Sequence, residues 1–501
     1  MRLDRTMMVP ALTAAMMACG GAAGVETKGG AAGTDAPSEP APPPRTLADD
    51  VVVDHVSINQ AVEVTLVKEG AAVATPNAPI IAGRPALVRV FAKPTGKATP
   101  SLAAELRVAR PGKADVVVRA AARPIALEMD AMDPATTFTF ELAADAITAD
   151  ASFSVTLGTT LEPGSDVVRF PAEGSASLGA KTGSAKMRVK FVPVRYDQDG
   201  SGRTPSLSDV SAYRNALYKM YPAADVEISV REPLPWTKVV EGDGNGWDDL
   251  LDAVIQTRRT DRAPDDVYYV GIFTPAASLH DFCDSACVLG VAPLAMEREI
   301  GLRVAMVLGY DEISSGSTLA QELAHAMGRE HAPCGGADGP DPEYPYARAA
   351  IGVVGWNPLT KKLVDPSRAK DFMSYCGPTW ISDYTYAGLY ERLEYVSGGT
   401  STSPQKSTGS KSAMQTYRVR ADGSVRPGPI VDVAGGGITS GGKEGIEIVY
   451  ESANGATTTV RGRAVADRTG STLVLAPAAP AGATHARIAV GAVTFRTTVA
   501  R

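Results

Sequence analysis

Hydrophobic and polar residues alternate along much of residues 51–185. Such alternation is typical of strands that turn one face toward a core, and the Pro and Gly residues between the runs supply turns. Short strands separated in this way predict an Ig-like β-sandwich over residues 51–185. The runs lie at 56–66, 87–91, 116–118, 138–140 and 153–157.

The pattern changes over residues 186–396, where helical and strand-like segments alternate. Apolar residues at positions 210, 213, 217 and 220 recur at the spacing of one helix face, and Pro222 ends that run. A second set at 247, 250, 251 and 254 repeats this spacing. The order predicts a central α/β domain that leads into another helix near residue 321. The strand-like runs lie at 187–194, 226–230, 267–273 and 304–308.

The last part of the chain returns to strand-like runs, at 446–450, 473–475 and 488–495. A segment rich in Gly, Ser and Thr, residues 397–412, precedes them and predicts a linker. Residues 413–501 are therefore expected to form a small all-β domain. A chain of 501 residues is also too long for one hydrophobic core, so the sequence predicts a multidomain protein.

Composition supports this interpretation and excludes one class of partner. The chain has 49 Gly, 36 Pro and only 6% aromatic residues, which favours short strands and many turns. Its net charge is −7, and both signs are interspersed along the chain. Without a basic patch or stripe, nucleic acid is not an expected partner.

The N-terminus combines basic residues with a short apolar run. Arg2 and Arg5 precede residues 7–18, which have the length of a signal-peptide core and are too short to span a bilayer. Residues 16–19, Met-Met-Ala-Cys, resemble a bacterial lipobox. The resemblance implies a lipoprotein signal peptide over 1–19, with lipid on Cys19; the alternative is an ordinary secretory signal with a chance Cys.

A lipid on Cys19 would make the membrane a partner and would anchor the exported protein in the bacterial cell envelope, on the periplasmic or surface face of the outer membrane. Stable anchoring takes more than one acyl chain, and the lipobox resemblance implies several. Residues 20–50 are mostly Gly, Ala, Pro, Ser and Thr, and predict a disordered tether.

Four further cysteines remain, and an even number in an exported protein predicts two disulfides. Three pairings are open, of which Cys283–Cys287 with Cys334–Cys376 is favoured. A zinc site made of cysteines alone is the competing interpretation, and the unrelated spacings argue against it.

Residues 321–331, Gln-Glu-Leu-Ala-His-Ala-Met-Gly-Arg-Glu-His, hold the strongest chemical signal in the chain. On a helix, Gln321, Glu322 and His325 share one face, because residues three and four apart are neighbours. Gly328 can adopt a positive φ, end the helix and bring His331 beside His325. Two imidazoles and a carboxylate at a helix end suit a zinc ion with a general base next to it.

This segment resembles the metzincin metallopeptidase signature H-E-x-x-H-x-x-G-x-x-H, with Gln321 in place of the first His. About forty residues later, Met373 and Tyr375 match the Met-turn of that family and the tyrosine that its astacin and serralysin branches place nearby. Ser382 then begins what resembles the closing helix of such a domain. The resemblance covers residues 186–396.

The resemblance implies a zinc metalloendopeptidase that hydrolyses peptide bonds in a protein or peptide by metal-activated water. His325 and His331 would be zinc ligands, and Glu322 would be the general base that later delivers its proton to the leaving amine. Tyr375 would stabilise the charged tetrahedral intermediate, and Met373 would support the floor of the site.

Gln321 leaves the activity open, because a neutral amide oxygen is a poor zinc donor beside imidazole. Gln321 also fits a capping box with Thr318, which would point it away from the metal. Three outcomes remain: weak binding with Gln321 as third ligand, binding through the two His and another group such as Tyr375, or no metal. A catalytically inactive pseudo-peptidase that binds partners at the surface is therefore the main alternative, and a purely structural lipoprotein is the third.

Residues 197–202, Asp-Gln-Asp-Gly-Ser-Gly, open like a calcium loop, with Asp197 and Asp199 as oxygen donors. The Glu expected eleven residues after the first Asp is replaced by Ser208, so a solvated turn is the favoured interpretation and calcium the alternative.

Overall fold

The computed structural model shows a multidomain, mostly β protein with 17% helix and 40% strand. It describes residues 46–184, 186–283, 287–310, 312–397, 411–420, 422–435, 445–467, 469, 471–490 and 493–499. The predicted signal peptide with Cys19 and most of the predicted tether lie outside these residues. In the described part of the chain, no helix is long and apolar enough to span a membrane.

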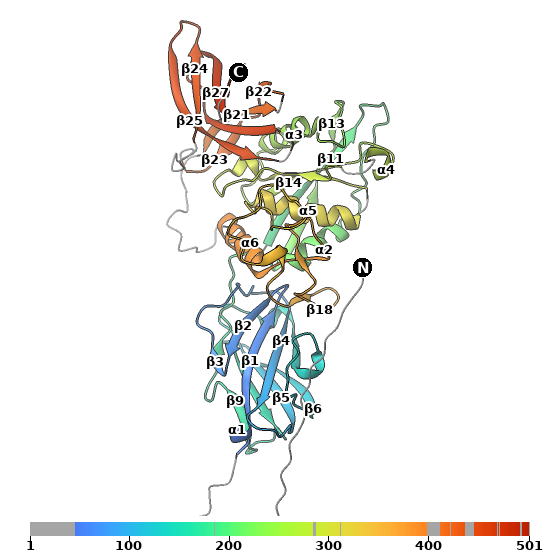
Figure 1. The fold of residues 1–501 in the computed structure, drawn as a ribbon, viewed down its shortest axis with the longest axis vertical. Coiled ribbons are helices and arrows are strands. Elements are labelled where there is room, and N and C mark those ends of the chain that lie inside the picture. The colour runs from blue at the N-terminus through green and yellow to red at the C-terminus, as the bar shows by residue number, and fades with distance from the viewer. Residues whose placement is uncertain are drawn as a thin grey trace, which may run out of the picture. The chain divides into compact units, whose positions relative to one another are not determined.

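Two five-stranded sheets form the N-terminal β region, residues 46–184 (Figure 1). The first has the order β3-β2-β1-β4-β7; the second has the order β10-β8-β5-β6, with β9 paired to β8. Alternating residues of β5 and β7 are buried, as the period of two predicts. The elements are α1 (Leu47–Asp50), β1 (Val51–Asn59), β2 (Glu63–Lys68), β3 (Ala71–Ala72), β4 (Ala86–Pro94), β5 (Ser101–Ala109), β6 (Val116–Pro124), η1 (Pro134–Thr136), β7 (Phe138–Leu142), η2 (Ala144–Ala146), β8 (Ser152–Gly158), β9 (Val167–Phe170) and β10 (Ala176–Ser177).

A sheet of order β12-β11-β14-β16-β15 lies at the centre of the next region, residues 186–397, called the central region below. Its first four strands run parallel, and β15 is the antiparallel edge strand beside β16. The strands are β11 (Lys186–Tyr196), β12 (Asp225–Val230), β13 (Leu234–Trp236), β14 (Val267–Phe273), β15 (Gly290–Val291), β16 (Val304–Leu308), β17 (Gly355–Asn357), β18 (Lys362–Val364), β19 (Lys370–Asp371) and β20 (Thr379–Trp380).

The helices of the central region follow the predicted periodicity closely. Leu389 and Leu393 are buried on α6, and the Ser382 side chain caps its first turn by accepting from the Thr385 amide. Acidic residues begin α3 and basic residues end it, which complements the helix dipole. The helices are α2 (Ser211–Met220), α3 (Trp247–Thr260), α4 (Leu279–Phe282), η3 (Ile300–Leu302), α5 (Glu312–Ala326), η4 (Ala347–Ala349) and α6 (Asp383–Val396).

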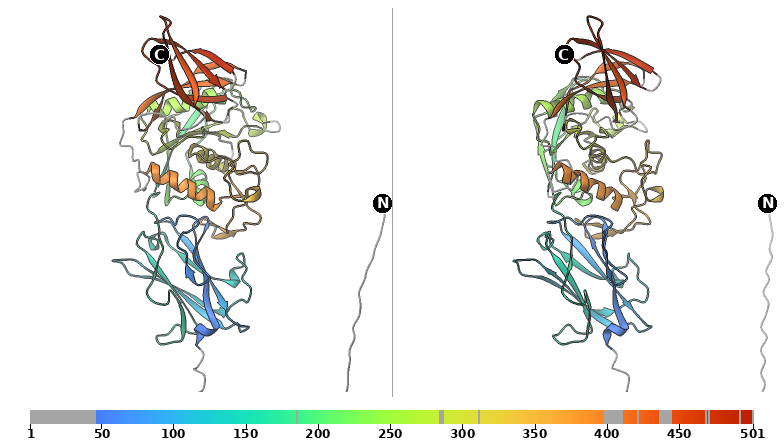
Figure 2. Two further views of the ribbon diagram at one scale, coloured as in Figure 1. Left: turned by 60° about the vertical axis from the view of Figure 1, so that its left-hand side comes forward. Right: turned by 90° about the vertical axis from the view of Figure 1, so that its left-hand side faces the viewer.

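The C-terminal β region, residues 411–499 where described, is one eight-stranded sheet of order β22-β21-β26-β25-β24-β27-β28, with β23 paired to β21. Its red strands curve into a barrel-like arrangement (Figure 2). Most of the predicted linker, 398–410, lies outside the described residues. The strands are β21 (Ser412–Arg420), β22 (Val425–Pro427), β23 (Val431–Val433), β24 (Ile446–Ser452), β25 (Thr457–Ala466), β26 (Ser471–Pro477), β27 (Ala483–Val490) and β28 (Val493–Thr498).

Hydrophobic cores cross both predicted domain boundaries. One core joins the two N-terminal sheets to α2, α5, α6 and Met373. A second core joins α3, β14 and β16 to residues of the C-terminal β region such as Val431 and Leu475. The boundaries at residues 185 and 397 stay predictions, since both sides of each contribute to a common core.

Candidate active site

Helix α5 and the turn after it position the candidate residues. The helix begins at Glu312, so Thr318 lies inside it and donates its hydroxyl to the Ser314 carbonyl (3.3 Å). The predicted capping box of Thr318 and Gln321 is therefore wrong: an N-cap has to precede the helix. The Gln321 amide forms no hydrogen bond with any described residue and is only partly buried, which leaves it free to turn.

Gly328 ends this helical segment in the way the sequence predicts. Its φ is +83°, and its amide donates to the His325 carbonyl (2.8 Å). A Cβ at this position would lie 2.9 Å from Nη2 of Arg392 and 3.1 Å from the Ala295 carbonyl oxygen. Both the backbone conformation and the crowding therefore require glycine.

The turn brings the two imidazoles together. The Nε2 atoms of His325 and His331 are 3.1 Å apart, and the ring planes are nearly perpendicular, at 86°. Both side chains are buried, with 4% and 2% exposure. The convergence expected from the H-x-x-G-x-x-H spacing is thus present.

Backbone carbonyls fix the outer nitrogen of each ring. Nδ1 of His325 lies 2.7 Å from the Arg329 carbonyl oxygen, and Nδ1 of His331 lies 2.7 Å from that of Asp338. A carbonyl only accepts, so each Nδ1 carries the hydrogen, and in the neutral rings both Nε2 lone pairs face each other. Two lone pairs at this distance require a shared cation or proton between them.

This pair fits a zinc ion. Zinc bound at about 2.0–2.1 Å by two imidazole nitrogens in tetrahedral geometry separates them by about 3.3 Å. An outer Nδ1–H bound to a carbonyl is also the usual support of a metal-binding His. Among the described residues, no group of three or more His, Cys, Asp and Glu side chains is arranged to hold a metal.

Glu322 lies on α5 one turn before His325 and is also buried, at 5% exposure. Edge strand β15 passes close beside it, since a Cβ at Gly290 would lie 2.7 Å from Cγ of Glu322. Tyr221, at the end of α2, donates its hydroxyl to the Ala320 carbonyl (2.6 Å) and so fixes this turn of α5. Burial, together with the charges of Tyr268 and Glu322, raises the pKa of Tyr221 well above its ordinary value, so its hydroxyl stays a donor.

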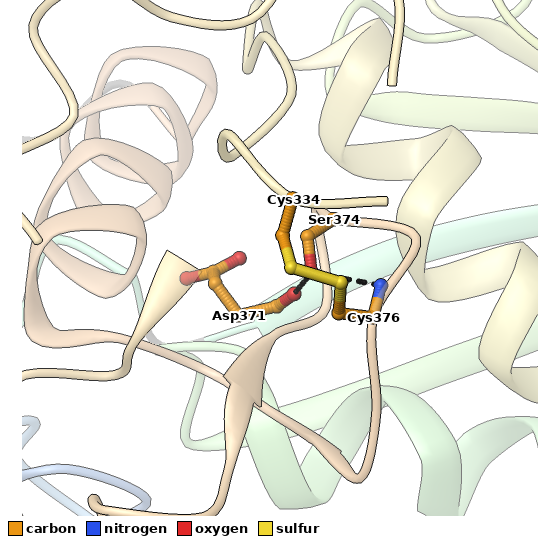
Figure 3. Close-up of a disulfide and its surroundings, with 4 residues drawn as sticks. All are labelled: Cys334, Asp371, Ser374 and Cys376. Atoms are coloured by element: carbon orange, nitrogen blue, oxygen red, sulfur yellow. Dashed lines mark hydrogen bonds between the residues drawn. A yellow bond between two sulfur atoms is a disulfide. The ribbon is translucent and has the colours of Figure 1, made fainter. Parts of the chain in front are cut away.

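Asp371 organises the turn that carries Met373. One carboxylate oxygen accepts from the Met373 amide (2.8 Å) and the other from the Ser382 amide (2.9 Å). The Ser374 hydroxyl donates to the Asp371 carbonyl (2.7 Å) and accepts from the Cys376 amide (3.3 Å), as Figure 3 shows. Burial raises the pKa of Asp371, and these hydrogen bonds oppose the rise.

A disulfide joins this turn to the segment that follows His331. Cys334 and Cys376 are bonded, as predicted (Figure 3), and so are Cys283 and Cys287 in the loop before β15. The Ala332 amide donates to the Met373 carbonyl (3.1 Å), and the Tyr375 amide donates to the Cys334 carbonyl (3.2 Å). His331 and the methionine turn therefore form one covalently closed unit.

Tyr375 borders the imidazole pair on the solvent side. Its ring centre lies 5.1 Å from that of His331, and 52% of the residue is exposed. Met373, by contrast, is 1% exposed and belongs to the core that contains α5. Tyr375 thus lies at the surface beside His331, and Met373 lies in the core.

Sequence reasoning missed Asp371, Tyr221 and the carbonyls of Arg329 and Asp338. The role of Asp371 could have been predicted, because an Asp side chain commonly accepts a hydrogen bond from the backbone amide two residues later, in an Asx turn. The carbonyl partners had none, since every residue has a carbonyl and only the folded chain selects two of them.

The segment 197–202 forms a turn, and Arg203, which follows it, forms an ion pair with Asp199. Hydrogen bonds from Ser201 and the Arg203 charge lower the pKa of Asp199. Calcium at Asp197 and Asp199 stays a prediction.

No protein-family model matches this chain, and no curated protein matches it either.

Proposed function

We propose that the protein is a zinc-dependent endopeptidase of metzincin-like type. The observation that carries the proposal is the pair of buried Nε2 atoms, 3.1 Å apart, with each Nδ1 bound to a backbone carbonyl. In this arrangement His325 and His331 would hold zinc, with Gln321 or Tyr375 as a further ligand. When bound, zinc supplies a Lewis acid that activates water and polarises a peptide carbonyl.

The remaining roles belong to side chains of this chain. Glu322 takes the proton of the attacking water and passes it to the leaving amine. Tyr375, at the solvent rim, donates its hydroxyl to the oxyanion that forms at the attacked carbonyl.

A second candidate function, a pseudo-peptidase that binds a peptide without cleaving it, is favoured by one residue. Gln321 takes the position of the first ligand His in the metzincin signature, and an amide oxygen binds zinc weakly compared with imidazole. Loss of even an outer support of a metal ligand costs about 10–100-fold in metal affinity or activity, so a weaker ligand should cost at least as much.

The finer domain assignment belongs to the same proposal. We assign residues 51–185 to an Ig-like β-sandwich, 186–396 to a metzincin-like domain and 413–501 to a small β-domain, carried on a lipid-anchored tether. Two sheets with a common core support the first assignment, and a single curved sheet supports the third. The metzincin-like domain and the lipid anchor rest on the resemblance of the sequence motifs alone.

Metal analysis of the purified full chain tests the proposal. We expect one zinc per chain at micromolar free zinc, lost in His325→Ala and His331→Ala and kept in His485→Ala, a matched control far from α5 in sequence. Casein cleavage should disappear in Glu322→Gln while zinc is retained. Absence of zinc in the native chain would refute the peptidase.

Gln321→His separates the two candidates. If the native chain is an active peptidase that tolerates Gln321, zinc content and cleavage change little. If both rise by tenfold or more, the native site is disabled and the pseudo-peptidase is correct.

A further inference from the structure

A basic cavity lies far along the chain from the imidazole pair, where α3 ends. It has a volume of about 480 Å³, in the range of small-molecule sites. Three elements meet there: the end of α3, the short helix η3 and strand β23 of the C-terminal β region. Its lining residues are Gln256, Arg258, Arg259, Thr260, Arg262, Ala263, Asp265, Ile300, Lys411 and Asp432.

The cavity walls are tightly built. A Cβ at Gly301 of η3 would lie 2.7 Å from Cβ of Val431 and 2.8 Å from the Asp432 amide nitrogen. The backbones of η3 and β23 therefore pack closely against each other. Both elements contribute a lining residue to the cavity, Ile300 and Asp432.

Positive charge exceeds negative charge along the lining. Four cationic side chains face two carboxylates, and both carboxylates are already engaged: Lys411 binds Asp265 (2.5 Å) and Arg259 approaches Asp432 (3.9 Å). Arg258 and Arg262 form no ion pair with any described residue. Arg262 is exposed at the mouth and has φ of +51°, a conformation that costs energy for a residue other than glycine.

Arg258 is a buried cation of the lining that has a hydrogen-bond donor without an acceptor. It is 4% exposed, and its Nη2 donates to the carbonyls of Pro264 (3.0 Å) and Val267 (3.3 Å). Its Nε has no hydrogen-bond partner among the described residues. Burial and the nearby Arg303 lower the pKa of Arg258 to about 10. A buried cation with an unused donor is costly unless an anion or another acceptor reaches it.

Arg303 repeats this arrangement behind Arg258. It is 2% exposed, donates to the carbonyls of Asp265 and Glu297, and its Nε is also without a partner in the described part of the chain. Other buried arginines are compensated differently: Arg418 faces two carboxylates, and Arg84 donates to four carbonyls. Arg258 and Arg303 thus have neither a carboxylate partner nor a hydrogen-bond partner for Nε among the described residues.

We propose that the cavity binds a small oxyanion, a phosphate group in the first place, through Arg258, Arg259 and Arg262. Guanidinium groups present planar pairs of donors that match the oxygens of phosphate, and two surplus positive charges suit a doubly charged group. Because α3, η3 and β23 all line the cavity, the bound anion would also fasten the C-terminal β region to the central region.

Titration calorimetry of the full chain with inorganic phosphate, at constant ionic strength set by chloride, tests this site. We expect saturable binding of one phosphate at millimolar concentration or below. Arg262→Gln and Arg259→Gln should each weaken it about tenfold or more, because a hydrogen bond to a charged group is lost. The matched control Arg169→Gln, an exposed arginine on β9, should bind as the native chain does.

Three outcomes would overturn the proposal. The first is no saturable heat at phosphate concentrations up to about 10 mM, and the second is phosphate binding in Arg262→Gln and Arg259→Gln that equals binding in the native chain. The third is binding of chloride with the same affinity as phosphate. Arg258→Lys serves as a further variant, since it keeps the charge and removes the planar pair of donors, and its fold is checked by circular dichroism. Vesicles containing phosphatidylglycerol form a second arm. Binding that depends on Arg262 only on vesicles assigns the oxyanion to a lipid headgroup; binding of free phosphate alone assigns it to a soluble ligand.

Discussion

The N-terminal and C-terminal β regions are joined to the central region by different forces. On the N-terminal side the two regions share an apolar core, and the fully buried Arg84 donates to the carbonyls of Tyr218, Tyr221 and Ala223 at the end of α2. The ion pair on this side, Lys361 with Glu141, is exposed. On the C-terminal side, three arginines meet three aspartates of α3. These residues are Arg418, Arg420, Arg426, Asp248, Asp249 and Asp252.

Because the two contacts differ in charge, salt and acid should affect them differently. Arg84 closes a helix C-terminus with uncharged acceptors, so neither salt nor acid removes its partners. Arg420 and Arg426 are 37% and 30% exposed in their side chains, and their partners are carboxylates, so salt screens them and acid neutralises them. The C-terminal side is therefore the adjustable one.

The largest effect is expected at the deepest ion pair of the C-terminal side. Arg418 is fully buried and binds both Asp252 and Asp467. Arg418→Met should lower the free energy of unfolding by about 3–5 kcal/mol, because it leaves the buried Asp467 carboxylate without a cationic partner and Asp252 with Arg426 alone. Urea unfolding measures the loss.

Its matched control is the double variant Arg418→Met with Asp467→Leu, which also removes the carboxylate that the single variant leaves without a cationic partner. We expect it to recover part of the stability. A double variant that is less stable than the single one would show that the pair itself, and not the abandoned charge, carries the effect.

A somewhat smaller loss is expected from Arg84→Met. Removing the guanidinium leaves several buried carbonyls at the end of α2 without donors, which should cost about 3 kcal/mol. The same urea experiment measures it, and Arg169→Met is the control, with a change within about 0.5 kcal/mol. Since Tyr221 also fixes α5, zinc content should fall in Arg84→Met and stay unchanged in Arg169→Met.

The smallest effect is a pH dependence confined to the C-terminal side. Burial alone would raise the pKa of Asp248, but hydrogen bonds and charge from Arg420 and Arg426 lower it overall. A folded-state pKa below the unfolded value of about 3.9 gives stability that is present above that pH and is lost as the pH falls through the folded-state value. Hydrogen exchange at pH 5 and pH 3 should show β21 and β22 loosening while β1 and β4 stay protected.

Asp248→Asn should remove most of this difference between the two pH values. Asp371 contributes to stability with the opposite pH dependence. Its pKa is raised in the folded state, so its contribution to the free energy of unfolding increases as the pH falls toward the pKa of the unfolded chain. Equal loosening of both ends at pH 3 would contradict the comparison.

The sequence predicted the elements whose pattern is local. Residues 267–273 form β14 with every residue buried, and the helix around residue 213 ends at Met220, just before Pro222, as predicted. The apolar positions predicted for the next helix, 247, 250, 251 and 254, are buried on α3. The start of α5 was missed because Ser314, Ser315 and Gly316 are weak helix formers. Packing explains them, since a Cβ at Gly316 would lie 2.9 Å from Cβ of Ala216, and glycine lets α2 approach α5.

The candidate site was readable only in part for the same reason. The spacing of Glu322, His325, Gly328 and His331 is local, so their convergence follows from one helix and one turn. The carbonyls that hold each Nδ1, and the basic cavity lined by residues as far apart as Arg258 and Asp432, depend on the folded chain. No periodicity records which distant segments meet.

One consequence follows from the bond between Cys334 and Cys376. Closing a loop with a sequence separation of 42 removes conformational freedom from the unfolded chain that is worth about 4 kcal/mol in the chain-entropy description. In a reducing compartment this bond would be open, and two backbone hydrogen bonds, Ala332 to Met373 and Tyr375 to Cys334, would be left to join the segment after His331 to the methionine turn. The local order of this turn would then depend on the redox conditions around the chain.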